Sequence, residues 1–593
     1  VSNKMSTWND TNRFPHNNFI WKGIDGTSVL ACVPPTHFIT WNMPSQIQEN
    51  WEAYIDKDSG GQTMNMFGYG DGGSGCTEEM IELMHRFDKL SIMPKCEHMG
   101  GQEFLEKNLK NNDSLQTWDG ELYLEMHRGT FTTKSNMKRA NRRLEYKLRD
   151  AEILSVLRGE DNKKTITDAY KKLLINQFHD ILPGSHIHPV YEDAMKDYAE
   201  IEKTVDSLIG TGSKYFNTLN FKRDALTFVP NKKGTATRYG VKGNWIIPNI
   251  PALSSASLRA TKFNDEWLNC NSNNIETPFY KAVLNDDGSI ASLVDKKQDR
   301  QWVDGDFNKL KIYTDCPGNY DAWDILPNYK DKQIEINVSE KLSLCELDGE
   351  CATFKTVLST DKSTWTMLIR FFRRSRGIEV ENIVDWNEKH KLAKAEFSCN
   401  VLTRKALCDT SAGFIERDTH KNTTWQQARF ETCHHKWADL SETDGGVALI
   451  NDGKYGIGFD ENTMSLSLLR ATIRPDVTSD MGHHNFSYMI YPHENGAVEA
   501  GVNKLAFQFN EQLVKSDVSY NGDTFEPLYL QAMKDCEDGS MTVIRLSEQD
   551  GKRGKIKLSK SVKLLDMLEN VIGEAVDTLE YKPFEIITIG IQK

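Results

Sequence analysis

The chain has 593 residues and a net charge of -13 at pH 7, so about two to four domains with a sizeable core are expected. This acidic balance, without a large cluster of lysine and arginine, argues against a nucleic-acid partner. No run approaches the roughly 18 apolar residues that cross a bilayer, and the start lacks a basic segment followed by an apolar one, which argues against membrane insertion and secretion.

The first 132 residues mix short strands, loops and helices. Strands are predicted at 28–33, 37–41 and 121–127, because apolar and β-branched residues gather there. A helix is predicted at 77–90, where a threonine can cap the first turn and acidic residues follow it. This alternation is typical of an α/β domain, which we place at residues 1–132.

A glycine-rich loop at residues 68–75 surrounds a single acid, Asp71, just ahead of that helix. A phosphate-binding loop would end in lysine followed by serine or threonine, and Cys76-Thr77 supplies no lysine, so nucleotide binding is poorly supported. Glycines let a backbone approach a ligand closely, which makes Asp71 a candidate general acid. A turn aspartate flanked by glycines is the alternative interpretation.

Residues 133–212 are predicted to be helical. Long helical periodicity favours a helix at 134–157, and apolar residues at the same spacing favour a second helix at 171–182, which a Pro-Gly pair would end. A third helix is predicted at 189–210, with proline in its first turn and one apolar stripe along its length. The three helices can pack as a bundle.

The second of these helices would hold His179 and Asp180 in its last turn. Carbonyl groups there lack helical partners and the helix dipole is negative, so a nearby cation is favoured. Imidazole is the commonest protein ligand for a divalent metal, which makes His179 a candidate ligand. A histidine that only caps the helix or bonds within the core is the alternative.

Residues 213–593 alternate short apolar and polar runs with turn signals such as Asp287-Gly288 and Asn521-Gly522, which favours large β-sandwich domains. Aromatic, acidic and histidine residues gather in several predicted loops, at 319–325, 385–391, 418–425, 433–442 and 480–488. Aromatic rings stack on sugar faces, and carboxylates accept hydrogen bonds from hydroxyl groups, so a sugar ligand is favoured. A second metal site is the alternative for four histidines, His434, His435, His483 and His484.

The eleven cysteines are scattered without CxxC pairs. An odd number of thiols in a long chain fits reduced cysteines better than a disulfide framework. A cytoplasmic location is therefore expected.

A series of segments carries a resemblance over essentially the whole chain. These are STWNDTNRFPHNNFIWKGIDG, FGYGDGGSG, ELYLEMHRGTFTTKSNMKRANRRLEYKLRDAE, LLINQFHDILPGS, NYDAWDI, RDTHKNTTWQQARFE, HKWADLSETDGGVALINDGKYG and MGHHNFSYMIYPH. In content and in order they resemble glycoside hydrolase family 38, the zinc-dependent α-mannosidases, and particularly the branch with the cytosolic and many bacterial enzymes.

The resemblance implies a catalytic α/β barrel, of which residues 1–132 are a remainder, then a three-helix bundle and then large β-sandwich domains. It implies that His179 binds zinc, that Asp180 lies in the sugar pocket, and that Asp71 is the general acid/base. Zinc in this family holds two adjacent mannose hydroxyls and helps to distort the ring toward an oxocarbenium-like state.

Four further residues fall in matching segments and are expected to contact the substrate, namely His127, Arg128, Asp321 and Trp323. The implied activity is hydrolysis of terminal α-linked mannose from oligosaccharides with retention of configuration, which needs two carboxylates. In the family, the nucleophile and a His-x-Asp pair of zinc ligands lie upstream of the segment matching STWNDTNRFP. We therefore expect this chain to be a carboxy-terminal portion that lacks the amino-terminal part of the catalytic domain, and to bind zinc poorly alone.

Two other interpretations remain open. The chain could be a non-catalytic carbohydrate-binding or scaffold protein without a nucleophile, or an unrelated zinc hydrolase, which would need further local metal ligands. The expected partners are a mannose-containing oligosaccharide, a separate amino-terminal piece and a second copy of the chain, with no nucleic acid and no membrane.

Overall fold

A computed structural model describes residues 4–71, 73, 75–87, 89–110, 112–210, 212–261, 263 and 267–593. Contacts divide the chain into two units, which are described separately. The first contains Val1–His127 with Asn422–Arg429, and the second contains Arg128–Lys421 with Phe430–Lys593. Within the part of the chain that the structure describes, every helix is too short or too polar to span a membrane.

The first unit contains a small sheet in which β1 pairs antiparallel with β2 and parallel with β3. The strands are β1 (Asn18–Lys22), β2 (Ser28–Cys32) and β3 (Gln116–Asp119). Phe19 and Ile20 belong to two different apolar clusters, as expected for neighbours on a strand. The short helices of this unit are α1 (Lys4–Thr7), α2 (Pro44–Ala53), η1 (Lys57–Ser59), α3 (Glu78–Phe87), α4 (Gly101–Phe104), η2 (Leu105–Leu109) and α8 (Thr424–Ala428).

Two predicted strands of this unit are wrong. Residues 37–41 form only an isolated bridge, and residues 121–127 form no strand. In both places a side chain takes a backbone N–H that a strand would use, since Trp41 donates to the amide of Gln46 and Glu125 donates to the amide of Asn9. The helix predicted at 77–90 and the strand predicted at 28–33 are confirmed as α3 and β2.

The sheets of the described residues do not include a closed barrel, so the predicted barrel remainder is not confirmed. The chain nevertheless combines a mixed α/β region, long helices and many β-sheets, and this coarser multidomain architecture is confirmed.

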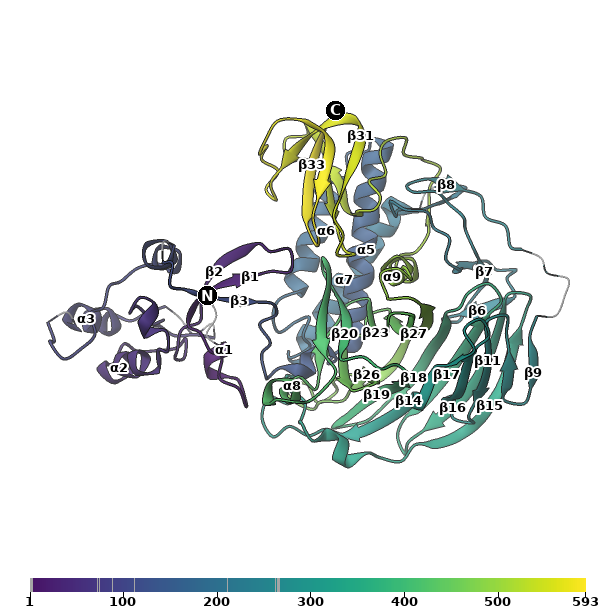
Figure 1. The fold of residues 1–593 in the computed structure, drawn as a ribbon, viewed down its shortest axis with the longest axis horizontal. Helices are drawn as coiled ribbons and strands as arrows, with labels where there is room; N and C mark the ends of the chain where they lie inside the picture. The colour runs from purple at the N-terminus through teal and green to yellow at the C-terminus, as the bar shows by residue number, and fades with distance from the viewer. Residues whose placement is uncertain are drawn as a thin grey trace. The chain divides into compact units, whose positions relative to one another are not determined.

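The second unit begins with η3 (Arg128–Phe131) and three long helices, α5 (Ser135–Arg158), α6 (Lys163–Asn176) and α7 (His188–Ile209), which Figure 1 shows in blue. The prediction is confirmed for α5, which ends at Gly159 in a left-handed conformation that glycine adopts easily, and for α7, with proline in its first turn.

These helices share one apolar core with the C-terminal sheet, drawn in yellow in Figure 1. Leu148 and Val205 of the helices belong to the same buried cluster as Leu530, Ile544 and Ile589 of the sheet. The sheet has the strand order β29-β30-β33-β31-β32 and consists of β29 (Tyr529–Asp535), β30 (Met541–Ser547), β31 (Gly554–Leu565), β32 (Val576–Tyr581) and β33 (Ile586–Gln592). A separate three-helix bundle is therefore not confirmed, because the helices bury their apolar faces against strands as well as against each other.

The central part of the unit consists of a large sheet packed on a smaller one around a common core. The large sheet contains, in spatial order, β15 (Asn337–Leu347), β16 (Cys351–Ser359), β17 (Thr364–Phe372), β18 (Ile378–Trp386), β27 (Gly482–Glu494), β24 (Gly445–Asn451), β23 (Trp437–Ser441), β20 (Lys405–Thr410) and β21 (Gly413–Asp418). The smaller sheet contains β14 (Val303–Thr314), β19 (Lys391–Cys399), β26 (Thr463–Arg470), β25 (Gly456–Asp460) and β22 (Thr432–Cys433). Buried tryptophans such as Trp302 and Trp386 fill the space between them.

Smaller elements complete the unit. One sheet contains β13 (Arg300–Gln301), β12 (Ile290–Asp295), β11 (Tyr280–Leu284), β10 (Asn274–Glu276) and β9 (Asn269–Asn271). Two others contain β28 (Val514–Lys515), β4 (Tyr215–Phe216) and β8 (Ser255–Ala256), and β5 (Thr227–Pro230), β7 (Val241–Ile246) and β6 (Ala236–Arg238). The remaining helices are η4 (Tyr329–Lys332) and α9 (Val502–Asn510).

Candidate functional site

The turn that follows α6 carries His179 and Asp180. The prediction that they lie in the last turn of a helix is wrong, because α6 ends at Asn176. Beyond it the chain closes tighter turns, in which Phe178 N donates to Ile175 O and Ile181 N donates to Phe178 O.

This turn is fixed to the start of α5. The buried ammonium group of Lys138 donates to the carbonyl oxygens of Thr133, Leu182 and Pro183, and burial lowers the pKa of Lys138 to about 7. Gly184 lies so close that a Cβ atom there would stand 2.6 Å from the carbonyl oxygen of Thr133. Only glycine fits this contact, and its φ of +87° also favours glycine.

The Asp180 carboxylate is oriented by two donors. Its Oδ1 accepts hydrogen bonds from Ser185 Oγ at 2.7 Å and from Trp323 Nε1 at 3.2 Å. Its Oδ2 lies 3.5 Å from Nε2 of His179, and the two side chains are 72% (His179) and 43% (Asp180) exposed. A carboxylate held on one oxygen keeps acceptor capacity on the other for a ligand.

An aromatic pair lies beside this carboxylate. Tyr320 is 46% exposed and packs edge to face against Trp323, with ring centroids 6.3 Å apart. Both rings come from the loop between β14 and η4, in the segment NYDAWDI. Trp323 was predicted from the sequence and Tyr320 was not, although the tyrosine lies in the same aromatic and acidic segment.

Asp321 holds this loop in place. It is 4% exposed, and its Oδ2 accepts hydrogen bonds from the backbone N–H groups of Ile473 and Arg474 and lies 3.1 Å from Nε2 of His390. Its buried position favours an indirect role, in which it fixes Tyr320 and Trp323.

Arg128 also holds this loop in place. It is 2% exposed, its guanidinium lies 3.6 Å from Asp324, and it stacks over the ring of Phe430. The next residue, Gly129, donates its N–H to the carbonyl oxygen of Trp323. The second unit thus brings together five of the predicted residues, namely His179, Asp180, Asp321, Trp323 and Arg128. His179, Asp180 and Trp323 are at least partly exposed, whereas Asp321 and Arg128 are buried.

The first unit carries Asp71 and His127. Asp71 is exposed at the corner of a turn that Gly73 N closes onto Gly70 O, and it has a positive φ of 53°. A Cβ atom at Gly70 would stand 2.4 Å from the ring of Phe38, so a larger residue here would displace that side chain. Gly72 and Ser74 of the predicted loop lie outside the described residues.

Aromatic rings are also present near these two residues. Tyr69 packs edge to face against Trp41, and both rings are exposed. His127 has a φ of 62° and packs edge to face against Trp8 at 5.5 Å. Tyr69 and Trp41 were not selected from the sequence; Tyr69 directly precedes the Gly70-Asp71 pair.

The metal-binding capacity of the described residues is limited. His179 and Asp180 offer a nitrogen and a carboxylate, both of which zinc accepts, whereas a catalytic zinc commonly has three protein ligands. Within the described ranges, no group of three or more His, Cys, Asp and Glu side chains is arranged to hold a metal ion. His179 and Asp180 alone thus fall short of the three ligands of a catalytic zinc.

The alternative metal site in the β-sheets is not supported. His434 is fully buried, accepts a hydrogen bond from Asn451 at Nε2 and contacts the carbonyl of Tyr455 through Nδ1. Both ring nitrogens are thus occupied. Burial lowers the pKa of His434 to about 3.

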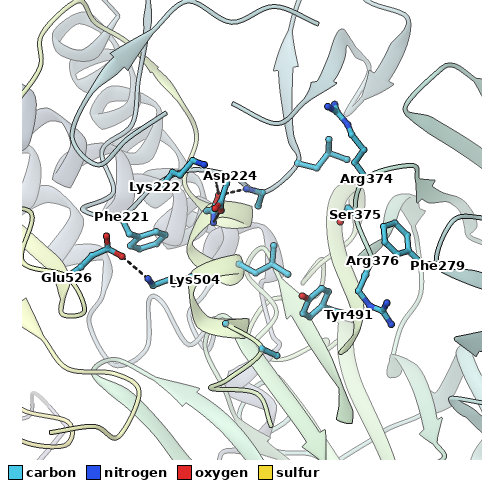
Figure 2. Close-up of a pocket in the computed structure, with 16 residues that line it drawn as sticks. Phe221, Lys222, Asp224, Phe279, Arg374, Ser375, Arg376, Tyr491, Lys504 and Glu526 are labelled. Carbon is cyan, nitrogen blue, oxygen red and sulfur yellow. Dashed lines mark hydrogen bonds and ion pairs between the residues drawn. The ribbon is translucent and has the colours of Figure 1, made fainter. Parts of the chain in front are cut away.

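A cavity of about 520 Å³ lies elsewhere in the second unit, next to α9 (Figure 2). None of the predicted site residues lines it. Three of the cations that line it have acidic partners, since Lys504 pairs with Glu526 in Figure 2, Arg374 pairs with Glu350, and Arg376 pairs with Asp295. The cavity is therefore not assigned a ligand.

Four family models match consecutive parts of the chain. The N-terminal domain of glycosyl hydrolases family 38 matches residues 2–121, and the α-mannosidase middle domain matches residues 125–215. The C-terminal domain of family 38 matches residues 275–478, and its C-terminal β-sandwich domain matches residues 527–589. The prediction that the chain lacks the amino-terminal part of the catalytic domain is wrong, because the N-terminal domain model matches residues 2–121.

Curated relatives are similar over most of the chain. Alpha-mannosidase G of Dictyostelium discoideum is 30% identical over 99% of this chain and 63% of its own length. Alpha-mannosidase 2C1 of Mus musculus is 31% identical over 87% of this chain and 52% of its own length. The α-mannosidase of Saccharomyces cerevisiae is 30% identical over 99% and 58%, respectively. The chain thus spans between about half and two thirds of the length of these relatives.

A solved structure has the same fold. The α-mannosidase of Enterococcus faecalis superposes with a TM-score of 0.77, covering 98% of this chain and 82% of that chain, at 14% identity. At that identity the likeness concerns the fold.

Proposed function

Because the chain belongs to glycosyl hydrolase family 38, we propose that it acts as an α-mannosidase that removes terminal α-linked mannose from oligosaccharides with retention of configuration. One observation carries the proposal: Asp180 is held by Trp323 and Ser185 and lies beside the exposed ring of His179. The α-mannosidase names of the relatives support the choice of sugar.

The cluster around Asp180 suits a pyranose. A sugar ring presents an apolar face and several hydroxyl groups, so Tyr320 and Trp323 can stack on the ring while Asp180 accepts hydrogen bonds from hydroxyls. Asp321 and Arg128 act as positioning residues, because they fix the loop that carries the two rings.

We assign the general acid/base role to Asp71. In a retaining reaction this carboxyl group gives its proton to the departing glycosidic oxygen, and then takes a proton from water in the second step. Its exposed place in a glycine-rich loop supports this role, since glycines such as Gly70 and Gly73 have no Cβ atom to obstruct a substrate.

We assign His179 as a donor to a zinc ion, with Asp180 beside it in the sugar pocket. Zinc bound there would supply a Lewis acid for hydroxyl oxygens of the sugar. The residues of the chain would bind and orient the mannose. The eleven cysteines are all free thiols, which supports the further proposal of a cytoplasmic location.

The test measures three quantities: the rate of 4-nitrophenyl α-mannoside hydrolysis, the anomer of mannose that appears first as detected by proton NMR, and the zinc content of the protein. We expect turnover with the α-anomer formed first, and His179→Ala should lower zinc content and activity together. His483→Ala is the matched control, because His483 is another exposed histidine paired with an aspartate, and it should leave both unchanged.

Each result separates the alternatives. Release of the β-anomer first would overturn retention, and full activity of a zinc-free protein would overturn the metal assignment. Binding of mannose without any turnover would favour a carbohydrate-binding protein.

A further inference from the structure

An exposed thiol lies next to the loop that carries the aromatic pair. Cys316 follows β14, and its Sγ lies 3.3 Å from Nδ1 of His390. Nε2 of the same imidazole lies 3.1 Å from the buried carboxylate of Asp321. The thiol, the imidazole and the carboxylate therefore form a continuous chain of hydrogen bonds, although the cysteine and the histidine are 74 positions apart in the sequence.

The carboxylate determines which ring nitrogen carries the proton. An ionised carboxylate can only accept, so Nε2 of His390 must donate to Asp321, and Nδ1 of the neutral ring is left to accept the thiol proton. Asp321 is held by the backbone N–H groups of Ile473 and Arg474, and His390 N donates to Ala471 O. The base is thus oriented by a third group, as in nucleophilic sites built from cysteine and histidine.

The geometry points to Cys316 as a nucleophilic thiol that His390 activates and that hydrogen peroxide oxidises. His390 takes the thiol proton at Nδ1, and the sulfur attacks one oxygen of the peroxide. The O–O bond breaks, and the leaving hydroxide takes the proton from His390 to form water. Cys316 becomes a sulfenic acid by loss of two electrons, and the peroxide is reduced to water.

Two other exposed thiols of the chain provide an internal comparison. Cys345 donates its thiol to the carbonyl oxygen of Thr353, and burial raises its pKa. Cys76 lies at the end of the glycine loop. Among the described residues, neither thiol contacts an imidazole. Solvent access alone would therefore label Cys316 and Cys76 at similar rates, and the raised pKa of Cys345 would slow that thiol further.

The experiment compares rates of alkylation by limiting iodoacetamide, read peptide by peptide by mass spectrometry on the full chain. We expect Cys316 to react about tenfold or more faster than Cys345 and Cys76. His390→Asn should remove this advantage, because asparagine cannot take the proton yet tolerates the positive φ of 49° at this position. His483→Asn is the control, since that histidine pairs with Asp385 in the large sheet.

A second measurement follows the oxidation. After treatment with hydrogen peroxide, dimedone should capture a sulfenic acid at Cys316 in the unmodified protein and not in Cys316→Ser. Equal labelling of the three thiols, or full labelling in His390→Asn, would overturn the inference. A loss of mannoside hydrolysis on oxidation, absent in Cys316→Ser, would extend it to the sugar site, and that extension alone rests on the proposed function.

Discussion

The indole N–H of Trp323 donates a hydrogen bond to the carboxylate of Asp180 over 3.2 Å, across 143 residues of chain. This bond joins the turn after α6 to the loop after β14. The turn supplies the exposed imidazole and carboxylate, and the loop supplies the aromatic rings. Neither segment alone would supply all the groups of the proposed sugar site.

Trp323→Phe tests this bond. The variant keeps an aromatic ring and removes the donor, which should cost about 1 to 2 kcal/mol of interaction with substrate, or roughly a 5- to 30-fold loss in kcat/KM for a mannoside. Trp245→Phe is the control, because the buried indole N–H of Trp245 has no hydrogen-bond partner among the residues that the structure describes. Unchanged kinetics in Trp323→Phe would contradict a role for this donor.

Asp71→Asn tests the proton donor. An amide cannot give a proton to the glycosidic oxygen, so hydrolysis of an alkyl α-mannoside should fall about 100-fold or more. Hydrolysis of 4-nitrophenyl α-mannoside should fall less, because 4-nitrophenolate leaves without protonation. Asp58→Asn, at another exposed aspartate of the first unit, should alter neither rate. Equal losses on both substrates would argue against the acid role.

Lys138→Met tests the anchor of the turn. The change leaves three carbonyl oxygens without their donor and should lower the free energy of unfolding by about 1 to 3 kcal/mol. Mannoside turnover should fall as well, because the turn with His179 loosens. Arg143→Met removes an exposed ion pair on the same helix and should cost less than about 1 kcal/mol. Urea unfolding curves provide the comparison.

The buried imidazole of His434 should make the folded protein less stable in acid. Burial lowers its pKa in the folded protein to about 3, against 6.5 ordinarily, so between pH 6.5 and 3 the unfolded chain binds the extra proton. Stability therefore falls as the pH drops below 6.5, by about 1.4 kcal/mol for this group at pH 5.5. His434→Gln should show a smaller difference between urea midpoints at pH 7.5 and 5.5. His483 is exposed, so His483→Gln should show the same difference between the two urea midpoints as the unmodified protein.

The sequence predicted the long elements better than the short ones. The helices α5 and α7 carry sustained apolar stripes, and burial of those stripes determines their structure. The segment at 121–127 has strand composition, yet its backbone bonds to side chains from a distant segment, which local patterns do not contain. The end of α6 was misplaced because the tighter turns that follow keep the same apolar spacing as a helix.

The candidate site was predicted in part. One local motif identified His179 and Asp180, and another identified Trp323. The structure brings the three residues together. The pairing of Cys316 with His390 has no sequence signal, since two strands bring these residues together. Whether Asp71 and His127 act as predicted stays a prediction.

The order of strands in the C-terminal sheet determines when this sheet can be completed during protein synthesis. Strand β33 lies in the middle of that sheet, between β30 and β31, although it is the last of the sheet's strands to leave the ribosome. The helices α5 to α7 bury part of their apolar surface against this sheet. At ordinary rates of protein synthesis they wait on the order of a minute with that surface uncovered. A ribosome that stalls before β33 would leave part of this apolar surface of the helices uncovered.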